Sequence, residues 1–216
     1  SLNGIFDRML YDYYENTNHE YIGVCELWVE CEVPNGAEQV IEIPSALLDD
    51  ENITLTGLNT NTALHPLRNK KGVEITSELE KGIVITESLR ILNGLKLGDD
   101  VLLEIGNEQI TLEIVAISYE YSGEKAYLNI TDLSQLLFSN DTYYNAVYSS
   151  IELDESEYDI VINTNDIVDQ ASNMQGFFTL FISMMTISSI VIGGIIIYIL
   201  TVMTIEDNFN NISLFK

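Results

Sequence analysis

The chain has 216 residues, 34 of them acidic and nine basic, so its formal net charge at pH 7 is -25. Nucleic acid recognition needs clustered Lys and Arg, and the single basic cluster, Arg68, Lys70 and Lys71, is too small for it. We therefore expect no nucleic acid partner. The acidic excess is typical of a solvated surface, although it leaves open a site for a cationic peptide or a divalent metal.

The first elements expected along the chain are a short helix and a hairpin. Apolar residues recur at helical spacing within residues 4–15, which predicts the helix. Residues 21–33 alternate between apolar and mainly acidic side chains and end at the turn Pro34-Asn35-Gly36, which indicates a half-buried strand. Residues 39–43 alternate in the same way and are expected to pair with it.

Both cysteines lie within the strand expected at residues 21–33. In such a strand Cys25 and Cys31 would lie on one face, about 20 Å apart. A disulfide requires Cα atoms within about 7 Å of each other. We therefore expect both side chains to be reduced and to face the core.

Between residues 55 and 163 the pattern predicts strands interleaved with two short helices. Thr86 can cap the first helix, residues 87–95, and the second helix is expected at residues 131–138. The apolar face of the first helix would consist of Leu89, Ile91, Leu92 and Leu95. Strands are expected at residues 55–58, 82–85, 101–105, 109–119, 126–130, 144–151 and 158–163.

The irregular order of these elements predicts an α+β fold with a mixed sheet for residues 1–170. A stretch of this length can bury a core of its own. We expect it to form one domain, or to contain a subdomain around residues 72–140.

No pattern typical of an enzyme occurs in the sequence, which has no GxSxG, HExxH or P-loop motif. His19 and His65 are expected in solvated loops, because no Cys or His stands at ligand spacing from either. The acidic residues between Asp154 and Asp159 could attract calcium, but they lack the glycine and the spacing of an EF-hand loop. We therefore expect neither an enzyme nor a cofactor or metal site.

A long uncharged tract lies near the C-terminus. No Asp, Glu, Lys or Arg occurs between Asp169 and Glu206, and the core of the tract is residues 177–205. A membrane-spanning helix needs about 20 apolar residues, and this one would be about 44 Å long. A buried core helix would be shorter, and a secretory signal would lie at the N-terminus. We expect residues 171–205 to form a juxtamembrane and transmembrane helix, continuous with the preceding domain, and residues 206–216 to begin a cytoplasmic segment.

Small residues interrupt this tract. Ser189 and Gly193 have the small-xxx-small spacing that lets two membrane helices approach closely, and Gly194 follows directly. A solitary anchor would merely tolerate them, yet each glycine lowers helix propensity by about 1 kcal/mol. We therefore predict that Ser189, Gly193 and Gly194 pack against another membrane helix.

Three segments in a fixed order carry a family resemblance. The first is GIVITESLRILNGLKLGDDVLLE, residues 82–104, where an apolar strand leads into a helix and then a Gly-Asp turn. The second is Asn145-Ala146, and the third is the apolar tract followed by IEDNFNNISLFK, residues 205–216. Over roughly residues 82–216 the sequence thereby resembles the FtsX-like and MacB-like permease subunits of ABC transporters.

The resemblance implies that residues 1–170 lie outside the cell membrane, after an earlier membrane helix, and that residues 177–205 return the chain to the cytoplasm. It implies as partners a separate nucleotide-binding ATPase subunit, the rest of the permease or a second permease copy, and membrane lipid. Asp207 and Asn208 stand where many members carry a Glu-Arg pair, and Asn211 and Lys216 match later positions of the pattern. These four residues would form a cytoplasmic coupling segment.

The leading hypothesis is a permease component that couples ATP hydrolysis by another subunit to movement of its extracytoplasmic domain, for export or extraction of a peptide, lipid-linked or antibiotic substrate. The alternative is a single-pass membrane-anchored receptor or sensor with an acidic ligand-binding domain. A membrane-tethered enzyme would need a catalytic constellation that the motifs do not supply. Because the sequence begins at Ser1 and ends soon after the tract, we expect it to belong to a longer polypeptide.

Overall fold

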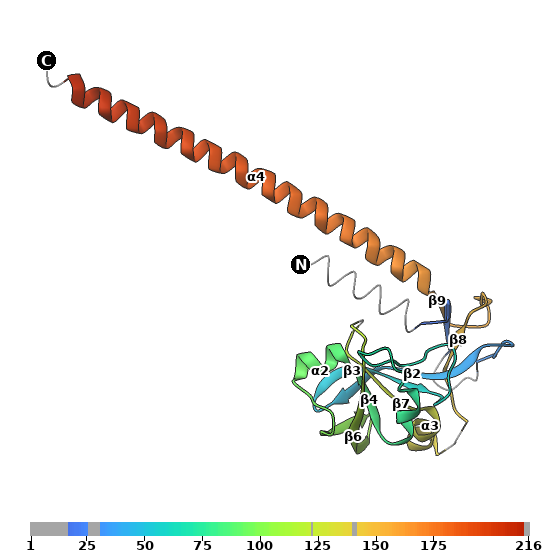
Figure 1. The fold of residues 1–216 in the computed structure, drawn as a ribbon. Helices are drawn as coiled ribbons and strands as arrows, with labels where there is room; N and C mark the ends of the chain where they lie inside the picture. The colour runs from blue at the N-terminus through green and yellow to red at the C-terminus, as the bar shows by residue number, and fades with distance from the viewer. Residues whose placement is uncertain (1–16, 26–30, 122, 140–141, 214–216) are drawn as a thin grey trace. The chain divides into compact units, whose positions relative to one another are not determined.

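The computed structural model describes residues 17–25, 31–121, 123–139 and 142–213 (Figure 1). These residues divide into two compact units between Asp169 and Gln170. The first unit, called the N-terminal domain below, contains all the strands among the described residues. The second consists of most of one long helix. The helix expected at residues 4–15 lies outside the described part of the chain.

Six strands of the N-terminal domain close into a ring. They follow the order β3-β7-β4-β6-β5-β2, and β2 pairs with β3 to complete the circle. The β3–β7 and β4–β6 pairs are parallel and the others antiparallel. The α+β fold with a mixed sheet is therefore confirmed. The six strands are β2 (Glu38–Leu48), β3 (Glu51–Leu58), β4 (Ile83–Thr86), β5 (Asp100–Ile105), β6 (Glu108–Ser118) and β7 (Lys125–Asn129).

Three more strands extend this ring: β8 (Ala146–Ser149), β1 (Tyr21–Val24) and β9 (Ile160–Asn163). β8 pairs with residues 38–40 of β2, β1 pairs with β8, and β9 pairs with β1. The hairpin expected between residues 21–33 and 39–43 is wrong, because β8 lies between β1 and β2. Alternation defines which face of a strand is buried, but it does not select the neighbouring strand.

Asn145 completes the hydrogen bonding where β2 leaves β8. The paired register of the two strands ends at Val40 and Ala146. Beyond it, the Asn145 side chain accepts a hydrogen bond from the Glu42 amide at 2.8 Å and donates one to the Glu42 carbonyl at 2.9 Å. The side-chain amide thus replaces a strand partner for β2.

The middle strands bury both of their faces. Ile83 and Ile85 of β4 pack with the side chains inside the ring, while Val84 packs with a second cluster on the other side. Tyr127 of β7 belongs to the same second cluster, whereas Ala126 beside it faces the ring interior. The domain therefore has two apolar layers that share one sheet.

Helix α2 (Glu87–Asn93) begins as expected from the sequence. The Thr86 hydroxyl accepts a hydrogen bond from the Leu89 amide at 3.4 Å, and Gly94 ends the helix with a φ of 68°. The predicted apolar face is only partly right, because Leu89 is buried but Ile91 and Leu92 are 54% and 66% exposed. Two further helical segments are η1 (Thr76–Glu80) and α3 (Ile130–Phe138), the latter capped by the Asn129 side chain.

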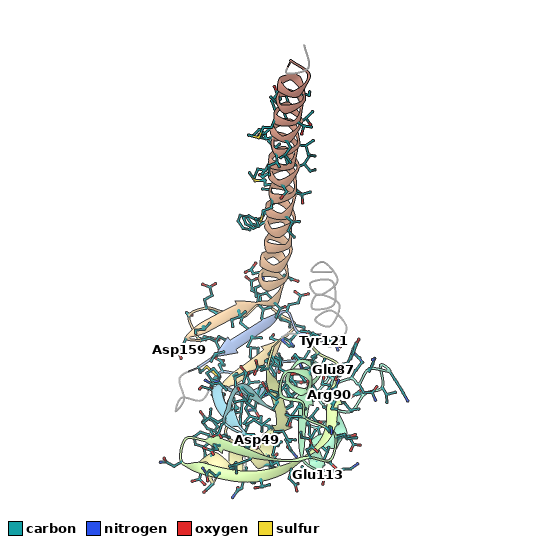
Figure 2. All side chains as sticks on the ribbon, turned by 90° about the vertical axis from the view of Figure 1, so that its left-hand side faces the viewer. Asp49, Glu87, Arg90, Glu113, Tyr121 and Asp159 are labelled. Atoms are coloured by element: carbon teal, nitrogen blue, oxygen red, sulfur yellow. A yellow bond between two sulfur atoms is a disulfide. The ribbon has the colours of Figure 1, made fainter. Side chains whose placement is uncertain are left out.

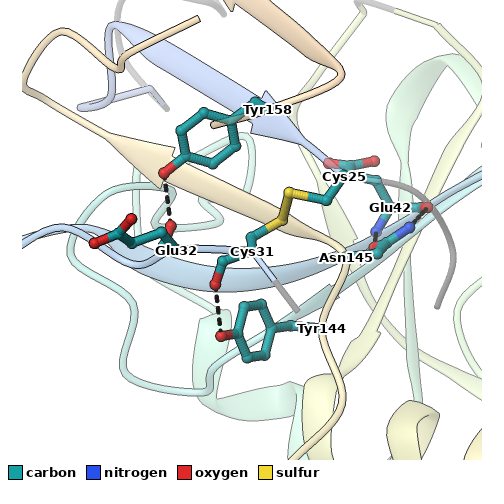
Figure 3. Close-up of a disulfide and its surroundings, with 7 residues drawn as sticks. All are labelled: Cys25, Cys31, Glu32, Glu42, Tyr144, Asn145 and Tyr158. Carbon is teal, nitrogen blue, oxygen red and sulfur yellow. Dashed lines mark hydrogen bonds between the residues drawn. A yellow bond between two sulfur atoms is a disulfide. The ribbon is translucent and has the colours of Figure 1, made fainter. Parts of the chain in front are cut away.

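The cysteines form a disulfide, so the prediction of two reduced side chains is wrong. Cys25 and Cys31 are bonded with their Cα atoms 5.8 Å apart (Figure 3). Strand β1 ends at Val24, so the extended spacing assumed from the sequence does not apply. Both side chains are buried, as expected, in a cluster with Val147, Leu153 and Tyr158.

Two tyrosine hydroxyls donate hydrogen bonds to the backbone carbonyls of Cys31 and Glu32. The Tyr144 hydroxyl donates to the Cys31 carbonyl at 2.8 Å, and the Tyr158 hydroxyl donates to the Glu32 carbonyl at 2.6 Å (Figure 3). Gly23 of β1 makes this packing possible, since a Cβ atom there would lie 2.5 Å from the Tyr158 ring. The disulfide is therefore built into the extension formed by β8, β1 and β9.

Helix α4 (Thr164–Ser213) follows β9 without an intervening residue. It passes through residues 165–180 without a break, as expected from the sequence. Within the described part of the chain, its segment Leu180–Ile205 is the one helix long and apolar enough to cross a membrane. No residue of that segment is buried, which sets it apart from a core helix.

Loss of the disulfide should destabilise the N-terminal domain. In the chain-entropy model the seven-residue loop contributes roughly 2 kcal/mol to the free energy of unfolding. We expect the variant C25S/C31S to lose about this amount in urea unfolding of the chain in nonionic detergent, followed by circular dichroism. Dithiothreitol should lower wild-type stability equally and leave the variant unchanged. Full alkylation of both wild-type cysteines without reductant would instead restore the reduced state inferred from the sequence.

Candidate functional site

A groove of about 680 Å³ opens on the N-terminal domain beside α2. Its volume lies within the usual range of small-molecule sites. We call it the cationic groove, because four basic side chains line it within a strongly acidic chain. Its lining consists of Asn69, Lys70, Lys71, Ile75, Glu78, Glu87, Arg90, Lys96, Leu97, Val115, Ala116, Ile117 and Tyr119.

Three lysines of the groove have no ion-pair partner in the part of the chain that the structure describes. Lys70, Lys71 and Lys96 are all exposed, and no described carboxylate lies within 4.0 Å of their ammonium groups. Their positive charges remain available to a ligand, although the chain carries 34 acidic residues.

Both carboxylates of the lining are already paired. Arg90 binds Glu87 one helical turn away on α2, with Nε–Oε2 and Nη2–Oε1 distances of 2.6 and 2.9 Å (Figure 2). The hydrogen bonds that Arg90 donates to Glu87 raise the pKa of Arg90 above its ordinary value. Glu78 accepts from Lys81 Nζ at 2.8 Å. With four basic and two acidic residues in the lining, the groove carries a net charge of 4 − 2 = +2.

Two turns present the free lysines. The Asn69 side chain accepts hydrogen bonds from the amides of Lys71 and Val73, at 2.9 and 3.2 Å, which closes the first turn. The Asp99 carboxylate accepts from the Lys96 amide at 2.8 Å and closes the second. Each turn is therefore held by a side chain that bonds backbone and leaves the ammonium groups free.

The floor of the groove is apolar and comes from the second half of β6. Val115 and Ile117 are half-buried there and Ala116 is buried. Leu97, next to Lys96 in sequence, lines the groove while 63% exposed. The site therefore offers positive charge beside an uncovered apolar surface, an arrangement that suits an anion with an apolar part.

Sequence reasoning identified only half of this site. It recognised Arg68, Lys70 and Lys71 as a basic cluster, but not that Arg90 and Lys96 join two of them. A signal was available, because six of the nine basic residues of the chain fall between Arg68 and Lys96. The fold brings them together because α2 and the following turn lie beside β6.

His19 and His65 were expected in solvated loops, and this expectation is wrong. They are only 4% and 8% exposed. His19 stacks on Tyr148 with ring centroids 4.1 Å apart, and its Nδ1 lies 3.1 Å from the Leu64 carbonyl. His65 Nε2 lies 3.4 Å from the Tyr127 hydroxyl. Both loops are folded onto the domain, a feature that no periodic pattern in a loop reveals.

Two carboxylates complete this buried polar cluster. Glu120 accepts hydrogen bonds of 2.6 Å from Ser118 Oγ and from the Tyr127 hydroxyl, and lies 3.9 Å from His65. Glu42 accepts from Thr56 at 3.1 Å and from the Tyr148 hydroxyl. Burial raises the pKa of Glu42 above its ordinary value.

Both buried histidines are neutral at pH 7. Burial lowers the pKa of His19 to about 3, and repulsion by His65 adds to the effect. Burial also lowers the pKa of His65 to about 3, with a further contribution from Lys125. Hydrogen bonds within the domain hold the cluster together, although His65 Nδ1 has no hydrogen-bond partner among the described residues.

The acidic run contains no metal centre in the described residues. Asp154 accepts hydrogen bonds from the Ser156 amide at 2.9 Å and from its hydroxyl at 2.7 Å, which lower the pKa of Asp154. The charge of Glu32 raises the pKa of Glu157. Among the residues that the structure describes, no group of three or more His, Cys, Asp or Glu could hold a metal ion.

Ser189, Gly193 and Gly194, the residues predicted to pack against another helix, lie on α4. The Ser189 hydroxyl donates to the Met185 carbonyl at 2.9 Å, so it is satisfied within its own helix. A Cβ atom added at Gly193 or Gly194 would meet nothing within 4 Å. Their packing against another helix stays a prediction. Of the expected coupling segment, Asp207, Asn208 and Asn211 lie near the end of α4, and Lys216 lies outside the described residues.

Comparison with known protein families gives no match. Comparison with curated protein sequences gives none either. Among solved structures, the chain is similar to the crystal structure of the periplasmic region of MacB from Actinobacillus actinomycetemcomitans. The two share 11% sequence identity with a TM-score of 0.40, over 76% of this chain and 98% of that one. The likeness concerns the fold, and in this chain the domain is followed by a helix able to cross a membrane.

Acid should destabilise the N-terminal domain through its buried histidines. Their pKa in the folded state is about 3, below the ordinary 6.5, so between these values the unfolded chain binds more protons and stability falls as pH falls. From pH 7 to pH 5 the loss should reach about 2 kcal/mol per histidine. The raised pKa of Glu42 acts in the opposite direction.

Urea unfolding at pH 7 and pH 5 checks this expectation. The variants H19Q and H65Q should be less stable than wild type at pH 7. The quantity to compare is the change in unfolding free energy between pH 7 and pH 5, which each variant should reduce by about half. Equal pH dependence in wild type and both variants would mean that these histidines titrate normally in the folded protein.

Proposed function

We propose that the chain is the extracytoplasmic domain and following membrane helix of an ABC transporter permease subunit of the FtsX-like or MacB-like kind. The carrying observation is that the chain enters and leaves the N-terminal domain at one sheet edge, and that the leaving strand continues directly into α4. A domain inserted between two membrane helices needs this arrangement, whereas a terminal ligand-binding domain does not.

Paired strands create that arrangement. In the antiparallel β1–β9 pair, Tyr21 at the start of β1 lies opposite Asn163 at the end of β9. Thr164, the first residue of α4, donates from its amide to the Glu20 carbonyl at 2.8 Å and from its hydroxyl at 2.9 Å. Thr164 is 3% exposed, so the start of the helix is fixed within the domain. The chain therefore enters the domain at Glu20, beside the residue at which α4 begins.

The disulfide supports an extracytoplasmic position for the N-terminal domain. Disulfides persist in oxidising compartments and are rare in the cytosol. Cys25 and Cys31 are bonded and buried together. In this reading α4 returns the chain to the cytoplasm, where its end meets a separate nucleotide-binding ATPase subunit.

The proposed mechanism is mechanical. ATP hydrolysis in the partner subunit would displace the cytoplasmic end of α4 through a coupling segment that includes Asp207, Asn208, Asn211 and Lys216. Since no linker separates β9 from α4, displacement of the helix would move the domain. Ser189, Gly193 and Gly194 would pack against the rest of the permease or a second permease copy within the membrane lipid.

The acidic composition suggested a receptor for a cationic ligand as the alternative. The cationic groove favours an anion instead, because its unpaired charged side chains are lysines. The absence of a linker before α4 also favours a coupling role over simple anchoring.

Two experiments in the native membrane test the proposal: the sidedness of reporter cysteines and the copurification of an ATPase subunit. A reporter cysteine in the exposed β5–β6 turn, N107C, should react with a membrane-impermeant maleimide on intact cells. The reporter N211C should react only after permeabilisation. An affinity-tagged full-length protein should also copurify an ATP-hydrolysing subunit in mild detergent. Cytoplasmic labelling of N107C, or a full-length protein with no further membrane helix, would contradict the proposal.

Gly193→Leu and Gly194→Leu test the packing role separately. A leucine would hold the neighbouring helix away at a cost of about 1–2 kcal/mol, which corresponds to roughly tenfold less assembled complex. The complex is quantified by native electrophoresis of detergent-solubilised membranes at equal expression. Ile195→Leu is the matched control, since it changes an exposed side chain of the same helix without filling a gap. Unchanged assembly in both glycine variants would remove the role assigned to these residues.

A further inference from the structure

We propose that the cationic groove binds a phosphate-bearing amphiphile. Its phosphate would be held by Lys70, Lys71 and Lys96, and its apolar part would cover the floor at Val115 and Leu97. This binding activity goes beyond the proposed transport role and does not depend on it.

Charge distribution is the first argument. The chain has a net charge of -25, yet three groove lysines lack a carboxylate partner among the described residues, while the lining carboxylates Glu78 and Glu87 are each paired. At physiological ionic strength the screening length is about 8 Å. Acidic groups elsewhere on the surface are therefore largely screened, and a ligand inside the groove is governed by the lysines that line it.

The free cations of the groove are lysines, and their chemistry favours a phosphate over a carboxylate ligand. Arg90 holds Glu87 through two parallel hydrogen bonds, so its planar guanidinium is not free for the bidentate capture of a carboxylate. The free groups are lysines, which act as compact point charges with three donors each. A phosphate monoester carries about -1.5 to -2 charges on three oxygens and can engage several lysines at once. A single carboxylate would neutralise only one of them.

The apolar lining calls for a ligand with more than a phosphate. Leu97 is 63% exposed directly beside Lys96, and Val115 and Ile117 are half-buried in the floor. Covering such a surface is favourable by about 25 cal/mol per Å². A groove of about 680 Å³ accommodates an alkyl group beside the headgroup. The positive charge of Lys96 lies next to the apolar side chain of Leu97 in sequence. The phosphate and the alkyl group of the ligand would therefore bind next to each other.

Hexyl phosphate is a suitable probe, because its short chain partitions weakly into micelles. We expect the chain in nonionic detergent to bind hexyl phosphate in isothermal titration at least tenfold more tightly than inorganic phosphate. Hexanol should give no signal above that of empty micelles. Equal affinity for hexyl phosphate and inorganic phosphate would reduce the site to a free-phosphate site and overturn the proposal.

The variant K70Q/K71Q/K96Q tests the headgroup site and should weaken hexyl phosphate binding at least tenfold. The matched control N61D/N107D/Q109E lowers the net charge by the same three units at exposed positions outside the lining. It should bind within about threefold of wild type if contact rather than overall charge decides. Equal losses in both variants would overturn the site. The three control positions lie outside the groove, whereas the three lysines line it. Thermal unfolding checks that every variant is folded.

Leu97→Ser tests the apolar half. It should weaken hexyl phosphate binding severalfold and leave inorganic phosphate binding unchanged, because only the alkyl group of the ligand would contact Leu97. Tighter binding of a soluble acidic peptide than of hexyl phosphate would identify a protein-docking surface and reject the amphiphile. Membrane topology and copurification of the ATPase do not involve the groove, so failure of binding would leave the proposed transport role standing.

Discussion

The N-terminal domain depends on one strand that belongs both to the six-stranded ring and to its three-stranded extension. Strand β2 pairs with β8 through residues 38–40, then with β3 between residues 41 and 48, and with β5 at Leu47 and Leu48. It thereby closes the six-stranded ring and also carries the extension that leads to α4. Asn145 makes the change of partner tolerable, since its side chain satisfies the amide and carbonyl of Glu42 where β8 no longer does. The Asn-Ala pair noticed in the sequence thus has a structural purpose at this junction.

The two ends of β2 have different consequences. On the ring side, the order β7-β4-β6 places β6 next to β4, and the chain leaving β4 forms α2 beside it. The cationic groove follows from that neighbourhood, because its cations come from α2 and the turns while its floor comes from β6. On the extension side, β8 supports β1 and β9, and these strands bring the start of α4 against Glu20. The cationic groove and the start of α4 therefore lie on separate parts of one sheet.

The polar interior of the domain contrasts with its acidic surface. His19, His65, Glu120 and Tyr127 lie within a few ångströms of one another and are nearly excluded from water. Such a cluster is stable only while its histidines remain neutral, because a buried charge without a partner is costly. It makes the packing of the two apolar layers sensitive to acid. The groove, by contrast, keeps its charges at the surface, where they are free to meet a ligand.

The sequence by itself determined the elements whose signals are local. Thr86 caps the start of α2, Pro34-Asn35-Gly36 forms the turn before β2, and the uncharged tract predicts a helix able to span a membrane. A cap, a turn and an apolar run each depend on residues close together in the chain, so their pattern is sufficient evidence.

Only the tertiary structure decided which distant segments meet. In the folded domain β8 lies between β1 and β2, and His19 and His65 are buried. Strand β1 ends at Val24, so Cys25 lies close enough to Cys31 to form the disulfide. The tertiary structure also joined Arg90 and Lys96 to Lys70 and Lys71 in one groove. The physical reason is that periodicity reports which face of a strand or helix is buried, whereas the identity of its neighbour depends on packing across the whole domain.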